Sequence, residues 1–147
     1  MSKVESILNG MSFSELTVSM VIEDAEAIVA ELKQCDADTT MTQFRKFYEE
    51  IDILYRKMLQ KTGSQTETEA HANAEEIFNK QFLPRIKMVL PKIAYAKGRE
   101  KIPQAFYDLF RLSIGKVNSR KEFINFKLFI EAILGFFKYQ STLTNNR

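Results

Sequence analysis

The chain has 147 residues, a formal net charge of +2 and a hydrophobic content of 45%. These values are typical of one globular domain, so we expect residues 1–147 to form a single domain in which 1–12 and 141–147 could fray. The single cysteine, Cys35, excludes an internal disulfide and favours a reducing compartment.

Two amphipathic helices are predicted in the first part of the chain. Ser12 and Glu15 form a capping-box pattern before the first helix, and Thr40 and Gln43 form another before the second. Gly63 can supply the left-handed residue that ends the second helix. The apolar face of the first helix comprises Leu16, Met20, Val21, Ala25, Ile28, Val29 and Leu32. That of the second comprises Phe44, Phe47, Tyr48, Ile51, Leu54, Tyr55, Met58 and Leu59.

The middle of the chain predicts a loop followed by helices that contain prolines. The polar stretch GSQTETE reads as a loop that enters a third helix over about 67–82. Pro84 suits the first turn of a new helix or a kink. Helical spacing then continues through Leu83, Ile86, Leu90, Ile93 and Ala94, with a bend expected at Pro91 and a stop at Gly98.

The C-terminal third predicts two further helices. Pro103 opens a short helix that ends near Gly115, and Ser119 with Glu122 gives a third capping box. The most apolar stretch, FINFKLFIEAILGFFKY, carries three charged residues and is too short to span a bilayer comfortably. No segment alternates as a strand does. We therefore expect an all-α fold, a compact bundle of five or six helices, in a soluble cytoplasmic protein.

Charge is distributed unevenly along the chain. Residues 1–40 hold two basic and eight acidic residues, whereas residues 80–121 hold eleven basic and two acidic ones. A local excess of this size favours a polyanionic partner, and nucleic acid is the commonest. The alternative from charge alone is an ordinary solvated face, with long cationic side chains lying beside the core.

Several basic residues recur on helix faces and form the candidate binding site. Arg85, Lys92 and Arg99 recur every seven residues, and Arg45 and Arg56 are eleven apart, so each set lies on one face. A row of charges along a helix suits phosphates better than base edges. The candidate RNA-binding residues are Arg45, Lys46, Arg56, Lys57, Arg85, Lys92, Lys97 and Arg99.

The residues needed for catalysis are scarce. The single histidine, His71, could pair with Glu75, but a metal site needs three or four ligands. Cys35 has no visible activating base. Adjacent acids, Glu49–Glu50 and Glu75–Glu76, do not face each other on a helix. The glycines form no phosphate-binding pattern. We expect no enzyme activity, metal or cofactor.

Four motifs occur in order along the chain: DAEAIVAEL, TTMTQFRKFYEEI, VLPKIAYAKGR and FKLFIEAILGFFKY. With this order and spacing, the chain resembles over about residues 21–140 the small subunit of the type III-A CRISPR effector, the Csm ribonucleoprotein complex. The resemblance implies a helical, non-catalytic protein for antiviral defence. It implies that several copies stack head to tail beside the backbone subunits, where target RNA pairs with guide RNA. Cleavage and the activities of the large subunit belong to other chains.

The resemblance also implies roles for particular residues. Arg45, Lys92, Lys97 and Arg99 stand in the matching motifs and would contact RNA, whereas Tyr95 would pack and hold the basic residues in place. Lys97 projects near the apolar stripe of its helix. The charge pattern alone supports RNA contacts by four others: Lys46, Arg56, Lys57 and Arg85.

Other hypotheses remain beside RNA binding. The main alternative is a helical adaptor whose basic face binds an acidic protein, with no RNA role; a small enzyme is the third. Phe136, Tyr139 and Leu112 are expected to be exposed and could form a homodimer face in the isolated chain.

Overall fold

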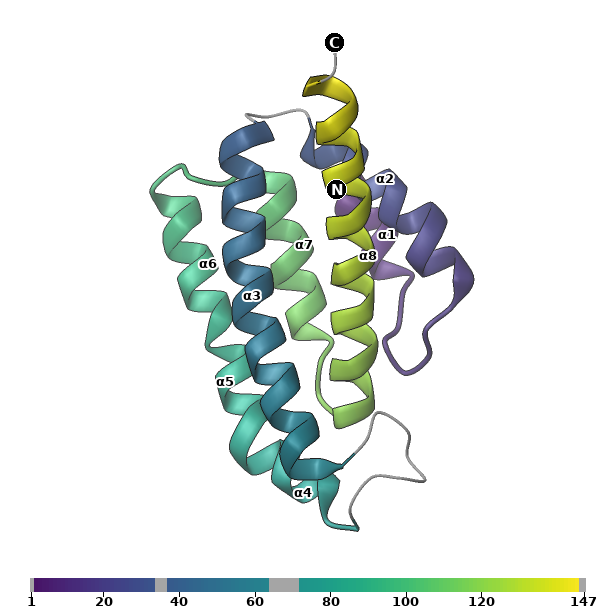
Figure 1. Ribbon diagram of the computed structural model, residues 1–147, viewed down its shortest axis with the longest axis vertical. Helices are drawn as coiled ribbons and strands as arrows, with labels where there is room; N and C mark the ends of the chain where they lie inside the picture. Colours follow the sequence, from purple (N-terminus) through teal and green to yellow (C-terminus); the bar gives the residue numbers. More distant parts are fainter. Residues whose placement is uncertain (1, 34–36, 64–71, 146–147) are drawn as a thin grey trace.

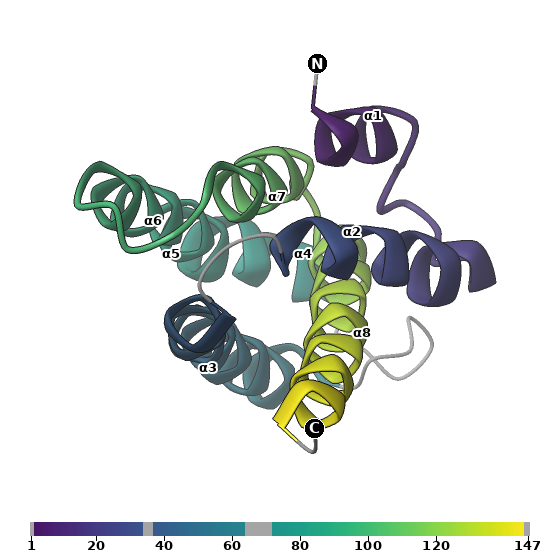
Figure 2. The same cartoon turned by 90° about the horizontal axis from the view of Figure 1, so that it is seen from above.

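Two long antiparallel helices, α3 (Ala37–Thr62) and α8 (Arg120–Asn145), run along most of the molecule (Figure 1). The structure is a computed structural model that describes residues 2–33, 37–63 and 72–145. Viewed from above, the other helices lie across one side of this pair and complete the bundle (Figure 2). The described residues contain no strand, and the predicted all-α helical bundle is confirmed.

The shorter helices cover the two sides of this pair. The N-terminal elements lie beside α8, and α5 and α6 lie beside α3 (Figure 1). In chain order they are α1 (Lys3–Asn9), the π-helix η1 (Met20–Asp24), α2 (Ala25–Leu32), α4 (Ala74–Ile77), the π-helix η2 (Phe78–Phe82), α5 (Leu83–Lys87), α6 (Val89–Gly98) and α7 (Gln104–Gly115).

Phenylalanine rings form the centre of the core. Phe44 of α3 meets Phe106 and Phe110 of α7 edge-on, with ring centroids 5.6 and 5.5 Å apart. It also meets Phe137 of α8 at 6.1 Å. Edge-to-face pairs of this kind add to the stabilisation from buried apolar area. The rings therefore fix the spacing of α3, α7 and α8.

The start of the chain differs from the prediction. Ser12 does not cap a helix; its hydroxyl accepts a hydrogen bond from the Ser14 amide. The cap is Thr17, whose hydroxyl oxygen accepts from the Met20 amide at 3.2 Å. No helix is predicted before Ser12, but α1 lies there and buries Val4 and Leu8. A segment of seven residues gives too few turns for its periodicity to be recognised.

The ends of the two long helices test the other capping predictions. Gly63 has a φ of 104° and ends α3 as predicted. Ser119 accepts from the Glu122 amide at 3.2 Å and begins α8 as predicted. Thr40 was assigned wrongly, because α3 already begins at Ala37.

The break between α5 and α6 lies at Met88 and not at Pro91. Pro91 is in the first turn of α6, where its missing N–H would have no helical partner. A proline ring clashes with the carbonyl four residues earlier, so the chain leaves the helix before it reaches Pro91. One result is that α6 buries Val89, Ile93 and Ala96, whereas the predicted core residue Ala94 is only partly buried.

Glu100, not Gly98, is the left-handed residue after α6. Its φ is 60°, whereas Gly98 ends the helix without a positive φ. The Lys101 amide donates to the Ala96 carbonyl at 2.9 Å, and the Glu100 amide donates to the Lys97 carbonyl at 3.0 Å. These two bonds form a Schellman motif. The turn fixes the direction in which the chain leaves α6 and thereby the position of Lys101.

The predicted homodimer face is only partly exposed. Tyr139 of α8 is 58% exposed, but Phe136 and Leu112 are half-buried against the core. The expectation that all three are exposed is therefore wrong. Another face of α8 is polar and meets α3, where the Tyr48 hydroxyl donates to the Glu131 carboxylate at 3.0 Å.

Candidate nucleic-acid interface

Three adjacent hollows lie between α3 on one side and η2, α5 and α6 on the other. Figure 1 shows α5 and α6 running beside α3. The upper, middle and lower hollows have volumes of about 380, 380 and 510 Å³. Lys92 borders both the upper and the middle hollow, and Arg85 borders both the middle and the lower one. We call these three hollows together the basic groove.

The lining of the basic groove carries a strong excess of positive charge. Among its described lining residues, Glu50 is the one carboxylate. The cationic lining residues are Lys46, Lys57, Lys61, Lys80, Arg85, Lys92, Arg99 and Lys101. Positive charges that line a concave surface add their potentials there, which raises the local concentration of an anionic ligand.

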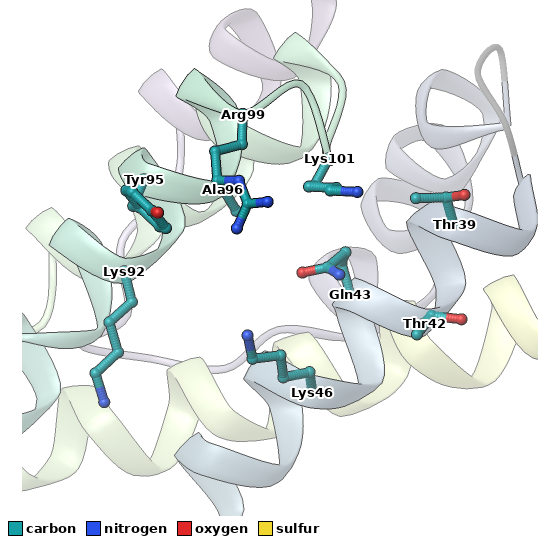
Figure 3. Close-up of a pocket in the computed structure, with 9 residues that line it drawn as sticks. All are labelled: Thr39, Thr42, Gln43, Lys46, Lys92, Tyr95, Ala96, Arg99 and Lys101. Carbon is teal, nitrogen blue, oxygen red and sulfur yellow. The ribbon is translucent and has the colours of Figure 1, made fainter.

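The upper hollow brings cations together from two helices and a turn. Lys46 on α3 and Arg99 at the end of α6 both point into the space between the helices (Figure 3). Lys101 enters from the turn after α6, and Gln43 lies on the α3 wall (Figure 3). The cations therefore approach one volume from three directions, where each can make a charge-assisted hydrogen bond to a phosphate.

Tyr95 borders the same hollow and is 67% exposed. The guanidinium carbon of Arg99 lies 5.7 Å from the centre of its ring, which is within cation–π range. The ring therefore packs on Arg99 and is not part of the core. The reason is the break at Met88, which turns α6 so that its buried positions are Val89, Ile93 and Ala96.

The middle hollow is apolar. Ile53 of α3 and Met88 at the helix break are 53% and 58% exposed, and Leu54 and Pro84 complete the floor. An ion pair between Lys92 of α6 and Glu50 of α3 crosses the groove at the upper edge of this hollow. The apolar surface separates the two basic ends.

The lower hollow is lined by lysines of α3 and by residues of η2 and α5. Lys61 donates a hydrogen bond to the Gln81 side chain at 3.1 Å, which joins α3 to η2. Lys80 is paired with Glu76 at 2.8 Å. Lys57 and Arg85 are exposed on opposite walls. Lys46 and Lys57 are three turns apart on α3, which places the basic ends about 16 Å apart along the helix.

The structure divides the eight predicted RNA-binding residues into two groups. Lys46, Lys57, Arg85, Lys92 and Arg99 line the basic groove. The seven-residue stripe of Arg85, Lys92 and Arg99 persists across the helix break. Arg45, Arg56 and Lys97 do not line it; Arg56 is paired with Asp52 at 2.9 Å on another face of α3. The eleven-residue spacing of Arg45 and Arg56 correctly placed them on one face, but that face is not the groove.

Three cations of the groove were not among the predicted residues. Lys101 follows the end of α6, so a helical wheel could not place it. Lys80 lies in the π-helix η2, whose wider turns place each side chain at a different angle from that expected for an α-helix. Lys61 could have been found, because it lies four residues after Lys57 on the same side of α3.

The described residues provide little for catalysis. They contain no group of three or more histidine, cysteine or acidic side chains that could hold a metal ion. Glu75 is used in the fold, because its carboxylate accepts from the Arg120 amide at 3.1 Å. His71 and Cys35, weighed as a ligand and a thiol, lie outside the described residues. Among the described residues, no helix has the length and apolar character needed to cross a membrane.

Comparisons with known proteins identify the family. The family model Csm2 Type III-A matches residues 15–142. Searches of curated proteins and of solved structures found no match. The matched range covers η1 through most of α8 and includes both walls of the basic groove. The chain therefore belongs to the Csm2 family and is a subunit of a type III-A CRISPR effector.

Proposed function

We propose that this protein is a non-catalytic RNA-binding subunit that holds RNA in its basic groove within the cytoplasmic effector. Its partners are guide RNA, target RNA and the backbone and large subunits of the complex. The observation that carries the proposal is the concentration of eight cations and one carboxylate in the three hollows of the basic groove. A helical subunit with this surface can position a nucleic acid without changing it.

The groove suits contacts with phosphates rather than with a particular sequence. Its cations lie on exposed helix faces, and lysine acts on phosphate as a point charge. A subunit of a CRISPR effector meets guides of many sequences, so its own contacts cannot depend on the bases. Binding should therefore be insensitive to sequence and sensitive to salt.

We also propose that copies of the chain stack head to tail, with the acidic N-terminal side against a basic side of the next copy. Glu23 of η1 and Glu26 of α2 are exposed there, beside exposed Val18 and Ile22. This side lies across the molecule from α5 and α6 (Figure 2). A contact between different surfaces on opposite sides extends from copy to copy, and each copy adds to the avidity for RNA.

A filter-binding titration tests RNA binding by the groove. The ligands are two single-stranded RNAs of unrelated sequence, each titrated at several salt concentrations. The double variant Lys46→Ala/Lys57→Ala removes one cation from each basic end of the groove. The matched control Arg45→Ala/Arg56→Ala removes two exposed cations of the same helix outside the groove.

The groove variant should bind both RNAs more weakly. The negative slope of log K against log salt should become shallower by about 1.4, since each lost contact contributes about 0.7. The control should keep the slope of the unmodified protein. Equal losses in both variants would show that total charge, not the groove, determines binding. An absence of binding even at low salt would overturn the proposal.

That last outcome would favour the protein-binding adaptor. The apolar middle hollow, with exposed Ile53 and Met88, is the feature that suits a protein partner. Stacking has its own test, the sedimentation of the Glu23→Lys/Glu26→Lys variant with RNA. Assembly indistinguishable from that of the unmodified chain would exclude the acidic side as a stacking surface.

A further inference from the structure

Tyr95 is the one aromatic side chain among the described lining residues of the upper hollow, and its setting differs from that of an ordinary exposed tyrosine. A single exposed aromatic needs no functional explanation. Tyr95 is surrounded by cations, however: Lys92 and Arg99 belong to the same helix, and Lys46 and Lys101 border the same hollow (Figure 3). Tyr139, 58% exposed on α8, lines none of the three hollows.

The ring of Tyr95 is exposed but contacts a neighbouring cation. It lies one turn before Arg99 on α6, and the guanidinium carbon lies 5.7 Å from the ring centre. The Schellman motif that ends α6 fixes the backbone at Arg99 itself, because the bonds from the Glu100 and Lys101 amides span it. A planar side chain with few rotamers on an ordered helix loses little conformational entropy when a ligand packs on it.

The hollow next to the ring has the size and polarity of a site for one nucleotide. Its volume of about 380 Å³ falls within the range of small-ligand sites. Arg99 and Lys46 point into it, and Gln43 supplies an amide that can both donate and accept (Figure 3). Sites for single-stranded nucleic acid combine two components: cations that contact the phosphates and an exposed aromatic ring on which a base stacks.

We propose that the upper hollow holds one unpaired nucleotide of an RNA strand, with its base stacked on Tyr95 and the adjoining phosphates on Lys46 and Arg99. The proposal rests on the proposed function and makes it more specific. A base in a duplex has both faces covered by its neighbours, so only an unpaired base can stack on the ring. Every base has such a face, so this contact adds affinity without selecting a sequence.

The experiment separates the contribution of the base from that of the phosphates. Fluorescence polarisation measures binding of a short single-stranded RNA and of a ribose–phosphate chain of the same length that lacks bases. Both are measured with the unmodified protein, Tyr95→Phe and Tyr95→Leu. Tyr139→Leu is the matched control, because it removes an exposed tyrosine ring outside the groove.

The unmodified protein and Tyr95→Phe should bind the intact RNA about tenfold more tightly than the base-free chain. Tyr95→Leu should lose this preference and bind both chains as the unmodified protein binds the base-free one. Tyr139→Leu should keep the preference. The single strand should also bind more tightly than the same sequence in a duplex.

Equal binding of the intact and base-free chains by the unmodified protein would overturn the stacking proposal and leave phosphate binding by the groove intact. A preference that survives in Tyr95→Leu would also overturn it, since the base would then contact another residue. If neither chain binds at low salt, the proposed function fails as well. The two failures are thereby distinguishable.

Discussion

Lys92 on α6 and Glu50 on α3 form an ion pair across the basic groove. Both side chains are partly solvated, with 57% and 30% of their surfaces exposed. An exposed pair of this kind contributes little to stability. Its larger effect is on the charge of the groove, because Glu50 neutralises one of the cations that would face a phosphate.

The first prediction follows from this pair. Glu50→Gln keeps the size of the side chain, removes its charge and releases Lys92. We expect affinity for single-stranded RNA to rise about two- to fivefold at low salt, the range that corresponds to an exposed ion pair. Glu49→Gln changes the same charge at an exposed neighbouring position that does not line the groove, and it should have a smaller effect. Equal gains in the two variants would contradict a local role for Glu50.

The second prediction concerns the turn after α6. Glu100 is held at a φ of 60°, where a side chain crowds the backbone and glycine does not. Glu100→Gly should stabilise the protein by about 1 kcal/mol, measured by urea unfolding. Glu100→Ala retains the Cβ atom and should give no such gain. A destabilised glycine variant would show that the Glu100 side chain makes a contact worth more than the backbone strain.

The third prediction concerns a buried polar contact between the two long helices. The Nε of Arg120 on α8 donates to the Thr62 hydroxyl of α3 at 2.9 Å, and both residues are buried. Thr62→Val removes the acceptor without changing the shape of the side chain. The expected loss is about 2 kcal/mol in the free energy of unfolding, since a buried charged donor loses a partner.

Thr142 provides the control for this substitution. Its hydroxyl donates to the Lys138 carbonyl one turn earlier, as the Thr62 hydroxyl does to the Met58 carbonyl, but Thr142 is exposed. Thr142→Val should therefore cost much less. Similar losses in the two variants would attribute the effect to the bond within the helix and not to Arg120.

The fourth prediction is a loss of stability at alkaline pH. Burial, followed by the hydrogen bond to Glu131, raises the pKa of Tyr48 above its ordinary 10.0. Burial would lower the pKa of Lys127, but hydrogen bonds with Glu131 and Tyr48 outweigh it and raise this pKa above 10.5. In both cases the folded protein holds the proton more tightly than the unfolded chain does. The free energy of unfolding should therefore fall as the pH rises above about 10.

Urea unfolding at a series of pH values from neutral to alkaline measures this slope. Tyr48→Phe removes one titrating group and should make the fall shallower. Tyr139→Phe removes an exposed phenol and is the control for loss of a hydroxyl. A fall that is unchanged in Tyr48→Phe would assign the alkaline transition to other groups.

The sequence predicted the long helices well and their junctions less well. The faces of α3 and α8 follow directly from apolar spacing, because each helix is long enough to repeat the pattern several times. Ser119 and Gly63 act as predicted, since caps depend on local chemistry. The bend expected at Pro91 lies earlier, at Met88, because the proline ring clashes with the carbonyl four residues before it and so disturbs the helix on its N-terminal side.

The candidate site was predicted only in part. The stripe of Arg85, Lys92 and Arg99 lies along the groove because its spacing keeps the residues on one face. A helical wheel cannot tell which face of α3 lies opposite this stripe, so Arg45 and Arg56 were selected together with Lys46 and Lys57. The opposing face is determined by tertiary packing, through contacts such as those of Phe44 with α7 and α8.

The two walls of the basic groove come from separate parts of the chain. The distance between them is determined by the packing of buried side chains between the helices. Phe47 of α3 and Ile93 of α6 are buried in the core of the two helices and line none of the three hollows. Protein interiors are closely packed, so a change in volume at either position shifts the helices rather than leaving them in place. The affinity of this surface for a polyanion therefore depends in part on uncharged side chains that the polyanion never touches.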